Sequence, residues 1–457
     1  MSALMNICHC INSVILYKIL TIPLLIWLFV GVGFLIMFKI KFANITYLPE
    51  ALKYAFGKKK QSDSVSAGVG SITALMSQLA CNLGIGNFAG SALALYYGGP
   101  GVIFWFFVLS FISSAIKFGE VVLAHKYRII ENGEIKGGAF YFIEKGLGKK
   151  FKFKRLIKFF AILSALSVVF ICTTTSAMQF NQINTLLFAK NGVLAIDKNV
   201  YVSAILMAIF IGLLLFGGLK KIGFAADILV PIMGVLYIAI CLVIIAINYN
   251  NILPSFGLVF AGAFNFEAGL SASVATFLFA LQKIINATDT GAGFSAISQS
   301  NSNVKIAGQQ GLVSFFDPFI VATIMAIGAF AVLVIGVPYN DPQFMGLLAI
   351  KQAFISLHPI FEHILILIAF MFGFTTIMAV GFYVQQACIY LFGSKFKNTY
   401  IVLYIFGYSI FSFGNATVIF SILDIAYSSG VMINLIAIAL LHKDIKMAWQ
   451  EYLLSKK

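Results

Sequence analysis

Charge is scarce in this chain. Of its 457 residues, 10% are Asp, Glu, Lys or Arg and 61% are hydrophobic, and the mean hydropathy is +0.98. Soluble domains carry about 25% charged residues, so the composition excludes a soluble protein and predicts an all-α polytopic membrane protein. The formal net charge of +15 does not require a nucleic-acid partner, because membrane proteins concentrate Lys and Arg in their cytoplasmic loops.

Cysteine and histidine are also few. The six cysteines and five histidines have no metal-ligand spacing beyond Cys8-His9-Cys10, and no H-x-x-E or H-x-x-x-H array occurs. Disulfide frameworks and metalloenzymes are therefore disfavoured. No His or Cys stands with an acid at catalytic spacing, so the protein is expected not to be an enzyme and to need no cofactor besides a coupling ion. No cleavable signal is evident before the first long apolar run.

Long apolar runs dominate what is present. With about 20 apolar residues per crossing, the chain divides into eleven predicted spans, at 14–38, 66–95, 101–124, 156–188, 200–217, 222–248, 266–298, 308–336, 359–392, 398–414 and 416–441. Two non-spanning helices are expected at Thr46 to Lys60 and at Pro342 to Leu357. If loops alternate sides, one side holds 25 of the 31 Lys and Arg residues, which predicts an N-terminus outside and a C-terminus in the cytoplasm.

Two of the spans are interrupted by polar, glycine-containing stretches. The second span contains Asn82-Leu83-Gly84-Ile85-Gly86-Asn87, and the seventh contains Asn286 to Gly293. Irregular backbone at membrane depth is tolerated where it lines a polar cavity, so we expect two discontinuous helices around a binding site. A glycine-packed helix crossing is the structural alternative for the first break.

The two breaks occupy matching places in the order of spans. With the first span set aside, they open two sets of five, and an odd number of spans per repeat inverts the second set. We therefore expect an N-terminal segment at 1–65, a first repeat at 66–248, a second, inverted repeat at 249–442 and a cytoplasmic tail at 443–457. Paired broken helices point to a transporter site near the bilayer midplane.

The first break offers groups for both an anion and a cation. A half-helix starting near Asn87 would direct its positive dipole end at a carboxylate, while carbonyls near Ala80 and Leu83 would face a cation. In the second break, Asp289 is a candidate partner for a substrate ammonium or a cation, because an acid inside a span is costly.

Four other acids fall within the predicted spans. Glu120 stands three residues from Lys117, and a structural ion pair is as good an explanation as function. A helix-start or interfacial role is favoured for Asp227. Asp317 and Asp424 receive no role.

Polar side chains also occur on the fourth and ninth spans. Gln179 and Asn181 place amides in an apolar helix, and Thr375 and Thr376 offer hydroxyls that suit a hard cation. For either threonine alone, a hydrogen bond to its own helix is the favoured explanation. Together they are interpreted as cation ligands because of their matching position in the second repeat.

Several motifs together resemble one known family. They are Gly84-Ile85-Gly86-Asn87-Phe88-Ala89-Gly90 with Gly98-Gly99-Pro100-Gly101, the run Gly137 to Gly148, Gly217 to Pro231, and Gln310 to Val313 with Tyr390 to Gly393. The first is similar to the G-T-G-N-I-A-G motif of the alanine or glycine:cation symporters, also called sodium:alanine symporters. The resemblance extends from about Ser66 to Gly393.

This resemblance implies a leucine-transporter-like fold and cation-driven uptake. The fold is a five-plus-five inverted repeat preceded by one extra helix. The implied activity is uptake of a small neutral amino acid such as alanine or glycine, driven by Na⁺ or H⁺. The expected setting is a bacterial or archaeal plasma membrane, with the protein acting as a monomer in the lipid bilayer.

The resemblance also implies site residues. The implied substrate site comprises Leu83, Gly84, Ile85, Gly86, Asn87, Gln179 and Asn181, with Asp289, Thr290 and Val380 from the second repeat. The implied Na⁺ site comprises Ala80, Leu83, Phe372, Thr375 and Thr376.

Two departures from the family concern substrate size. In the second break the acid Asp289 is one methylene shorter than the family's glutamate, and the family's tryptophan on the ninth span falls at Val380. Loss of an indole enlarges a pocket, so we expect a substrate bulkier than glycine. A membrane-embedded sensor or a channel is the alternative function, although no soluble output domain is present.

Overall fold

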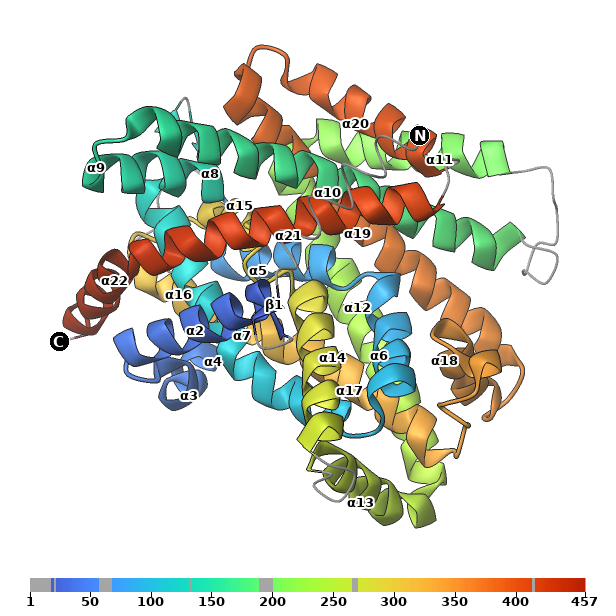
Figure 1. Ribbon diagram of the computed structural model, residues 1–457. Coiled ribbons are helices and arrows are strands. Elements are labelled where there is room, and N and C mark those ends of the chain that lie inside the picture. Colours follow the sequence, from blue (N-terminus) through green and yellow to red (C-terminus); the bar gives the residue numbers. More distant parts are fainter. Residues whose placement is uncertain are drawn as a thin grey trace.

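The computed structural model describes residues 18–19, 22–56, 68–131, 133–188, 200–264, 270–412 and 416–456 (Figure 1). The described chain is almost entirely helical, as expected. The helices of the first half are α2 (Leu24–Lys39), α3 (Ala43–Thr46), α4 (Leu48–Phe56), α5 (Ser71–Asn82), α6 (Ile85–Gly98), α7 (Val102–Tyr127), α8 (Ala139–Phe142), the π-helix η1 (Ile143–Leu147), α9 (Gly148–Lys150), α10 (Lys154–Phe188), α11 (Val200–Phe216) and α12 (Gly218–Ile247).

The second half also contains long helices and a broken one. Its helices are η2 (Tyr249–Asn251), α13 (Ile252–Ala263), α14 (Leu270–Thr288), α15 (Phe294–Ser298), η3 (Gln299–Asn301), α16 (Ala307–Ser314), α17 (Phe316–Val334), η4 (Pro342–Phe344), α18 (Leu347–Ile355), α19 (Ile360–Phe392), α20 (Lys397–Ser412), α21 (Ala416–Leu440) and α22 (His442–Leu454). The strands form two short antiparallel hairpins, β1 (Lys18–Ile19) with β2 (Ile22–Pro23) and β3 (Ile129–Glu131) with β4 (Glu134–Lys136).

Among the described residues, every predicted span after the first coincides with one helix or with two consecutive helices. The described part of the first span, 14–38, is instead the β1–β2 hairpin followed by α2, and this hairpin was not expected. Within the described residues, length and apolar composition alone qualify five helices as membrane-crossing, or up to seven when each bent pair counts as one span. The count of eleven therefore stays a prediction. The non-spanning helices at α4 and at η4 with α18 were expected, whereas α13, the β3–β4 hairpin and the helical form of the tail, α22, were not.

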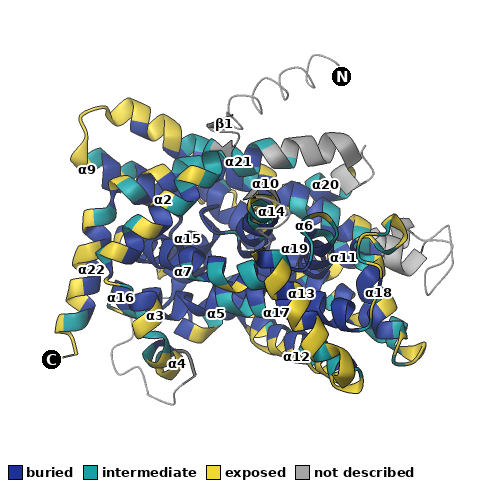
Figure 2. Ribbon diagram, turned by 60° about the horizontal axis from the view of Figure 1, so that its bottom comes forward, coloured by how far each residue is buried: buried dark blue, intermediate teal, exposed yellow. Residues whose placement is uncertain are grey.

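The site lies between two groups of helices. In one group α7 packs against α14, α16 and α17, and in the other α10 packs against α19 and α21. Helix α5 contacts α12 and α19 and runs through the buried centre of the molecule (Figure 2). Large apolar side chains are exposed along α11, α12 and α20, among them Leu213, Phe224 and Phe406. An apolar exterior of this kind suits contact with lipid rather than water.

Arg128, directly after α7, ties together backbone at one end of the site. Its guanidinium donates to the carbonyl oxygens of Ser300 and Ser302, both at 2.6 Å, and of Val304 at 3.3 Å. Burial lowers the pKa of Arg128 to about 10, so the group is still charged at pH 7. The charge satisfies carbonyls that η3 leaves without helical partners at its end.

We expect Arg128→Met to lower thermal stability, because a hydrogen bond to a charged group contributes a net free energy of about 1.5–3 kcal/mol. The measurement is the unfolding temperature in detergent, compared with Arg155→Gln, a change at an exposed position of α10. Equal melting temperatures for both variants would contradict the assigned role.

Candidate functional site

The first break separates α5 from α6 by two residues. Helix α5 ends at Asn82 and α6 begins at Ile85, two residues before the expected Asn87, with a bend of 55° between them. Gly84 has an extended backbone with φ −94° and ψ 172°, which any residue can adopt. Glycine is required for a different reason, because a Cβ at this position would overlap Nε2 of Gln179. Asn87 spans the break by donating to the carbonyl of Asn82 at 2.5 Å.

The second break has a strained backbone. Helix α14 ends at Thr288 and α15 begins at Phe294, and φ is positive at Asp289 (49°), Gly291 (84°) and Gly293 (90°). Glycine adopts this region freely, and Asp is among the few other residues that tolerate it. The turn exposes the carboxylate of Asp289 between the two halves of the helix.

Asp289 faces the first broken helix across the site. Its Oδ2 lies 3.6 Å from the thiol of Cys81 on α5, and its Oδ1 lies 3.5 Å from the hydroxyl of Tyr427 on α21. The hydroxyl of Thr290 hydrogen-bonds to that of Thr288 at 2.7 Å. Two breaks that are 200 residues apart in sequence therefore meet in space, as the pairing of half-helices predicted.

Side chains from α10 and α19 reach the first break. Oε1 of Gln179 accepts a hydrogen bond from the backbone N–H of Ile85 at 3.1 Å. The hydroxyl of Thr376 lies 3.1 Å from the carbonyl oxygen of Ala80 and 3.3 Å from that of Cys81, and it also bonds to Phe372 at 3.0 Å. Oxygen atoms therefore converge at the C-terminal end of α5, where the helix dipole is negative.

The two adjacent threonines do not behave alike. The hydroxyl of Thr375 bonds to the carbonyls of Met371 and Phe372 in its own helix and lies 3.7 Å from the sulfur of Met233 on α12. Thr376 therefore meets α5 as the sequence predicted, and Thr375 adopts the back-bonded arrangement favoured for an isolated membrane threonine.

Some of the remaining predicted residues are buried and others are exposed. Val380 and Phe372 are buried on α19, and Leu83 is buried in the first break. Asn181 lies on an exposed face of α10, apart from the buried Gln179. Gly86 is exposed, and nothing lies within 4 Å of a Cβ built on it. Open space therefore adjoins the start of α6.

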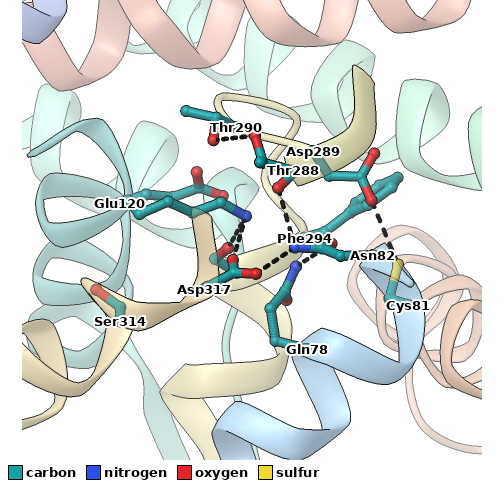
Figure 3. A network of polar contacts seen from close by, with 12 residues as sticks. Gln78, Cys81, Asn82, Glu120, Thr288, Asp289, Thr290, Phe294, Ser314 and Asp317 are labelled. Atoms are coloured by element: carbon teal, nitrogen blue, oxygen red, sulfur yellow. Dashed lines mark hydrogen bonds and ion pairs between the residues drawn. The ribbon is translucent and has the colours of Figure 1, made fainter. Parts of the chain in front are cut away.

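A buried polar network joins the two breaks (Figure 3). Nδ2 of Asn82 donates to Oδ1 of Asp317 at 2.5 Å and to the carbonyl of Thr288 at 3.0 Å. Gln78 donates to Oδ1 of Asn82 at 2.8 Å and accepts from the hydroxyl of Ser298 at 2.5 Å. Side chains of α5 thereby bond to both halves of the second broken helix, and Asp317 of α17 bonds to one of them, Asn82.

An ion pair completes this network. Nζ of Lys117 on α7 lies 2.9 Å from Oδ2 of Asp317, with both side chains fully buried, and it donates to the hydroxyl of Ser295 at 2.5 Å. Sequence reasoning gave Asp317 no role and considered Glu120 as the partner of Lys117. Glu120 instead accepts the backbone N–H of Ala296 at 3.3 Å.

Other acids have separate surroundings. Asp227, expected at a helix start or at the membrane interface, is an exposed residue of α12 and accepts a hydrogen bond from the hydroxyl of Thr73 on α5 at 2.7 Å. The side chain of Asp424 lies outside the described part of the chain.

Comparisons with known proteins agree with this arrangement. The family model described as "Sodium:alanine symporter family" matches residues 1–457. The sodium/alanine symporter AgcS of Methanococcus maripaludis is 33% identical over 432 residues, covering 92% of each chain. The putative sodium/proton-dependent alanine carrier protein YrbD of Bacillus subtilis is 29% identical, covering 94% of this chain and 90% of the relative.

A solved structure shares the fold. The crystal structure of MhsT in complex with L-phenylalanine matches with a TM-score of 0.59 and 16% identity, covering 82% of this chain and 89% of its own. The fold expected from the resemblance, with broken helices in a polytopic all-α bundle, is confirmed. The protein is a multi-pass membrane transporter and not an enzyme, and it belongs to the sodium:alanine symporter family.

Proposed function

We propose that this protein couples inward movement of Na⁺ to uptake of a small neutral amino acid bulkier than glycine, by alternating access. The observation that carries the proposal is the contact between the Thr376 hydroxyl and the carbonyls of Ala80 and Cys81. Hydroxyl and carbonyl oxygens are the ligands that hard cations prefer, and the end of a half-helix supplies the favourable dipole. Family membership favours a transporter over a sensor or a channel.

The amino acid is assigned to the open space beside Gly86. Its carboxylate would face the start of α6, where backbone N–H groups and the dipole favour an anion. The amide of Gln179 fixes the position of Ile85 at this helix start. The ammonium group would face Asp289, which is partly exposed in the second break. Coupling follows if each ligand favours the same closed state of the two broken helices.

The proposal is tested by uptake into proteoliposomes with Na⁺ and H⁺ gradients imposed separately. We expect a Na⁺ gradient to drive accumulation and unlabelled substrate to support counterflow. In a competition panel, amino acids larger than glycine should compete best. Accumulation driven by a proton gradient alone would show that the coupling ion is H⁺ and not Na⁺. A panel in which glycine and alanine outcompete all larger amino acids would contradict the proposed substrate size.

Asp289→Asn tests the proposed ammonium contact. The substitution keeps the shape but removes the charge, so the substrate concentration for half-maximal uptake should rise about tenfold, equivalent to about 1.4 kcal/mol. Asp341→Asn is a suitable control, because Asp341 caps the exposed helix η4. Unchanged substrate affinity in Asp289→Asn would remove Asp289 from the site.

A further inference from the structure

Lys117 is a cation that the proposed mechanism does not use. Among the described residues it is the lysine whose side chain is completely buried, and it is held by Asp317 and by Ser295. A buried charge is retained only where it is paired and hydrogen-bonded. The position of Lys117 near the middle of α7 therefore calls for a function or a structural explanation.

The position lies where both broken helices meet. Asp317, the partner of Lys117, accepts from Asn82 in the last turn of α5, and Asn82 donates to Thr288 at the end of α14. Ser295 belongs to the first turn of α15. The ammonium is thus connected to three of the four half-helix ends: directly to α15, through Asp317 to α5, and through Asp317 and Asn82 to α14.

The local charge favours a cation at this junction. The helices α5 and α14 both end here, with negative dipole ends, beside the carboxylate of Asp317, and the opposing positive end belongs to α15, a helix of five residues. In broken-helix transporters, such half-helix ends and carbonyls coordinate free cations. A covalently attached ammonium with three donors satisfies the same groups without leaving the protein.

We propose that Lys117 is a tethered cation that takes the place of a second coupling ion. The free cation bound beside Thr376 is then the single ion carried with each substrate molecule, while Lys117 remains paired with Asp317 throughout the cycle. This inference rests on the proposed function, because it assumes cation-driven uptake. Lys117 acts on the site through Asp317 and Asn82, as a positioning residue.

The first test uses the wild-type protein in proteoliposomes. The cation gradient that just prevents net substrate movement is measured at several membrane potentials, which gives the ratio of cation to substrate for either Na⁺ or H⁺. We expect a ratio of one. A ratio of two would overturn the tethered cation while leaving symport intact, whereas absence of any cation-driven uptake would overturn the proposed function.

The second test removes the ammonium. Lys117→Ser leaves a hydroxyl and free volume beside Asp317, so Na⁺ should enter and the Hill coefficient for Na⁺ should rise from about one towards two. Adding Asp317→Asn to the Lys117→Ser variant removes the carboxylate, so the Hill coefficient for Na⁺ should return to about one. Lys158→Ser, at an exposed position of α10, is the control.

Both outcomes are read in uptake and in Na⁺-dependent thermal stabilisation of purified protein, which does not require transport. A Lys117→Ser variant with the wild-type Hill coefficient in both measurements would overturn the proposal. If that variant does not fold, the wild-type ratio decides alone.

Discussion

Thr376→Val should raise the Na⁺ concentration for half-maximal uptake by about tenfold or more. Valine has nearly the shape of threonine but lacks the oxygen, so the site loses one cation ligand while α19 stays packed. Loss of a single metal-site interaction commonly costs 10–100-fold in affinity, or about 1.4–2.8 kcal/mol. Thr376 is buried between α19 and α5, so water cannot easily replace the missing hydroxyl.

Its neighbour provides the matched control. Thr375→Val changes the same chemical group one residue away, but the hydroxyl of Thr375 bonds within α19 and faces Met233. We expect Na⁺ activation of uptake to change less than about twofold there, within the effect of a lost back-bond. A larger effect at Thr375 than at Thr376 would place the cation on the other side of α19. Substrate affinity is also measured at saturating Na⁺. A value like that of the wild type would show that the substitution weakens Na⁺ binding and does not disrupt the whole site.

Gly84→Ala should reduce transport by about tenfold or more without preventing folding of the bundle. The added methyl would overlap Nε2 of Gln179 and lie 3.2 Å from the hydroxyl of Thr376. Gln179 must then turn away and lose its bond to the N–H of Ile85. The binding groups of the first break would be displaced together, and small displacements at such sites are expensive.

A double-mutant cycle identifies the cause. In a Gln179→Ala background the amide is already absent, so Gly84→Ala should have a much smaller additional effect. Gly90→Ala in the same half-helix is the control, because the nearest atom to its new Cβ is a carbon of Lys283 at 4.0 Å. Additive effects of Gly84→Ala and Gln179→Ala on initial uptake rates would show that the clash is not the cause.

Hydropathy and glycine placement were sufficient for the all-α class and for the two broken helices. Apolar runs of span length marked each long helix, and Asn82 to Asn87 and Asn286 to Gly293 marked both breaks, because polar residues and glycine inside a span have a high energetic cost. The short helix α13 and the β3–β4 hairpin were missed because they lie in segments treated as loops, where no membrane-length constraint applies.

Helical geometry explains which of the predicted side chains reach the first break. Residues two apart in a helix do not face each other, so Gln179 points into the site while Asn181 is exposed. Adjacent residues differ by about 100°, and only Thr376 of the threonine pair meets α5. The spacing within each pair is visible in the sequence. It could have predicted that only one member of each pair faces the site.

The pairing of Lys117 with Asp317 could not be predicted from residues that are neighbours in the sequence. The two residues are 200 positions apart, and Lys117 has a nearer acid, Glu120, on its own helix at a spacing that permits an ion pair. The choice depends on how α7 packs against α17. The same applies to Gln78 and Ser298, whose bond exists only because the two broken helices cross.

The bonds made by Arg128 constrain how the transporter can open. Arg128 joins α7 to the segment after η3, and the backbone of Val69, before α5, bonds to Asn301 and Asn303 in that same segment. The end of α7, the residue before α5 and the segment from Ser300 to Val304 are therefore bonded to one another on the far side of the two breaks, and they can separate only if these bonds are lost. The hydroxyl of Thr73 on α5 also donates to Asp227 on α12, so a separation of α5 from α12 would break that hydrogen bond.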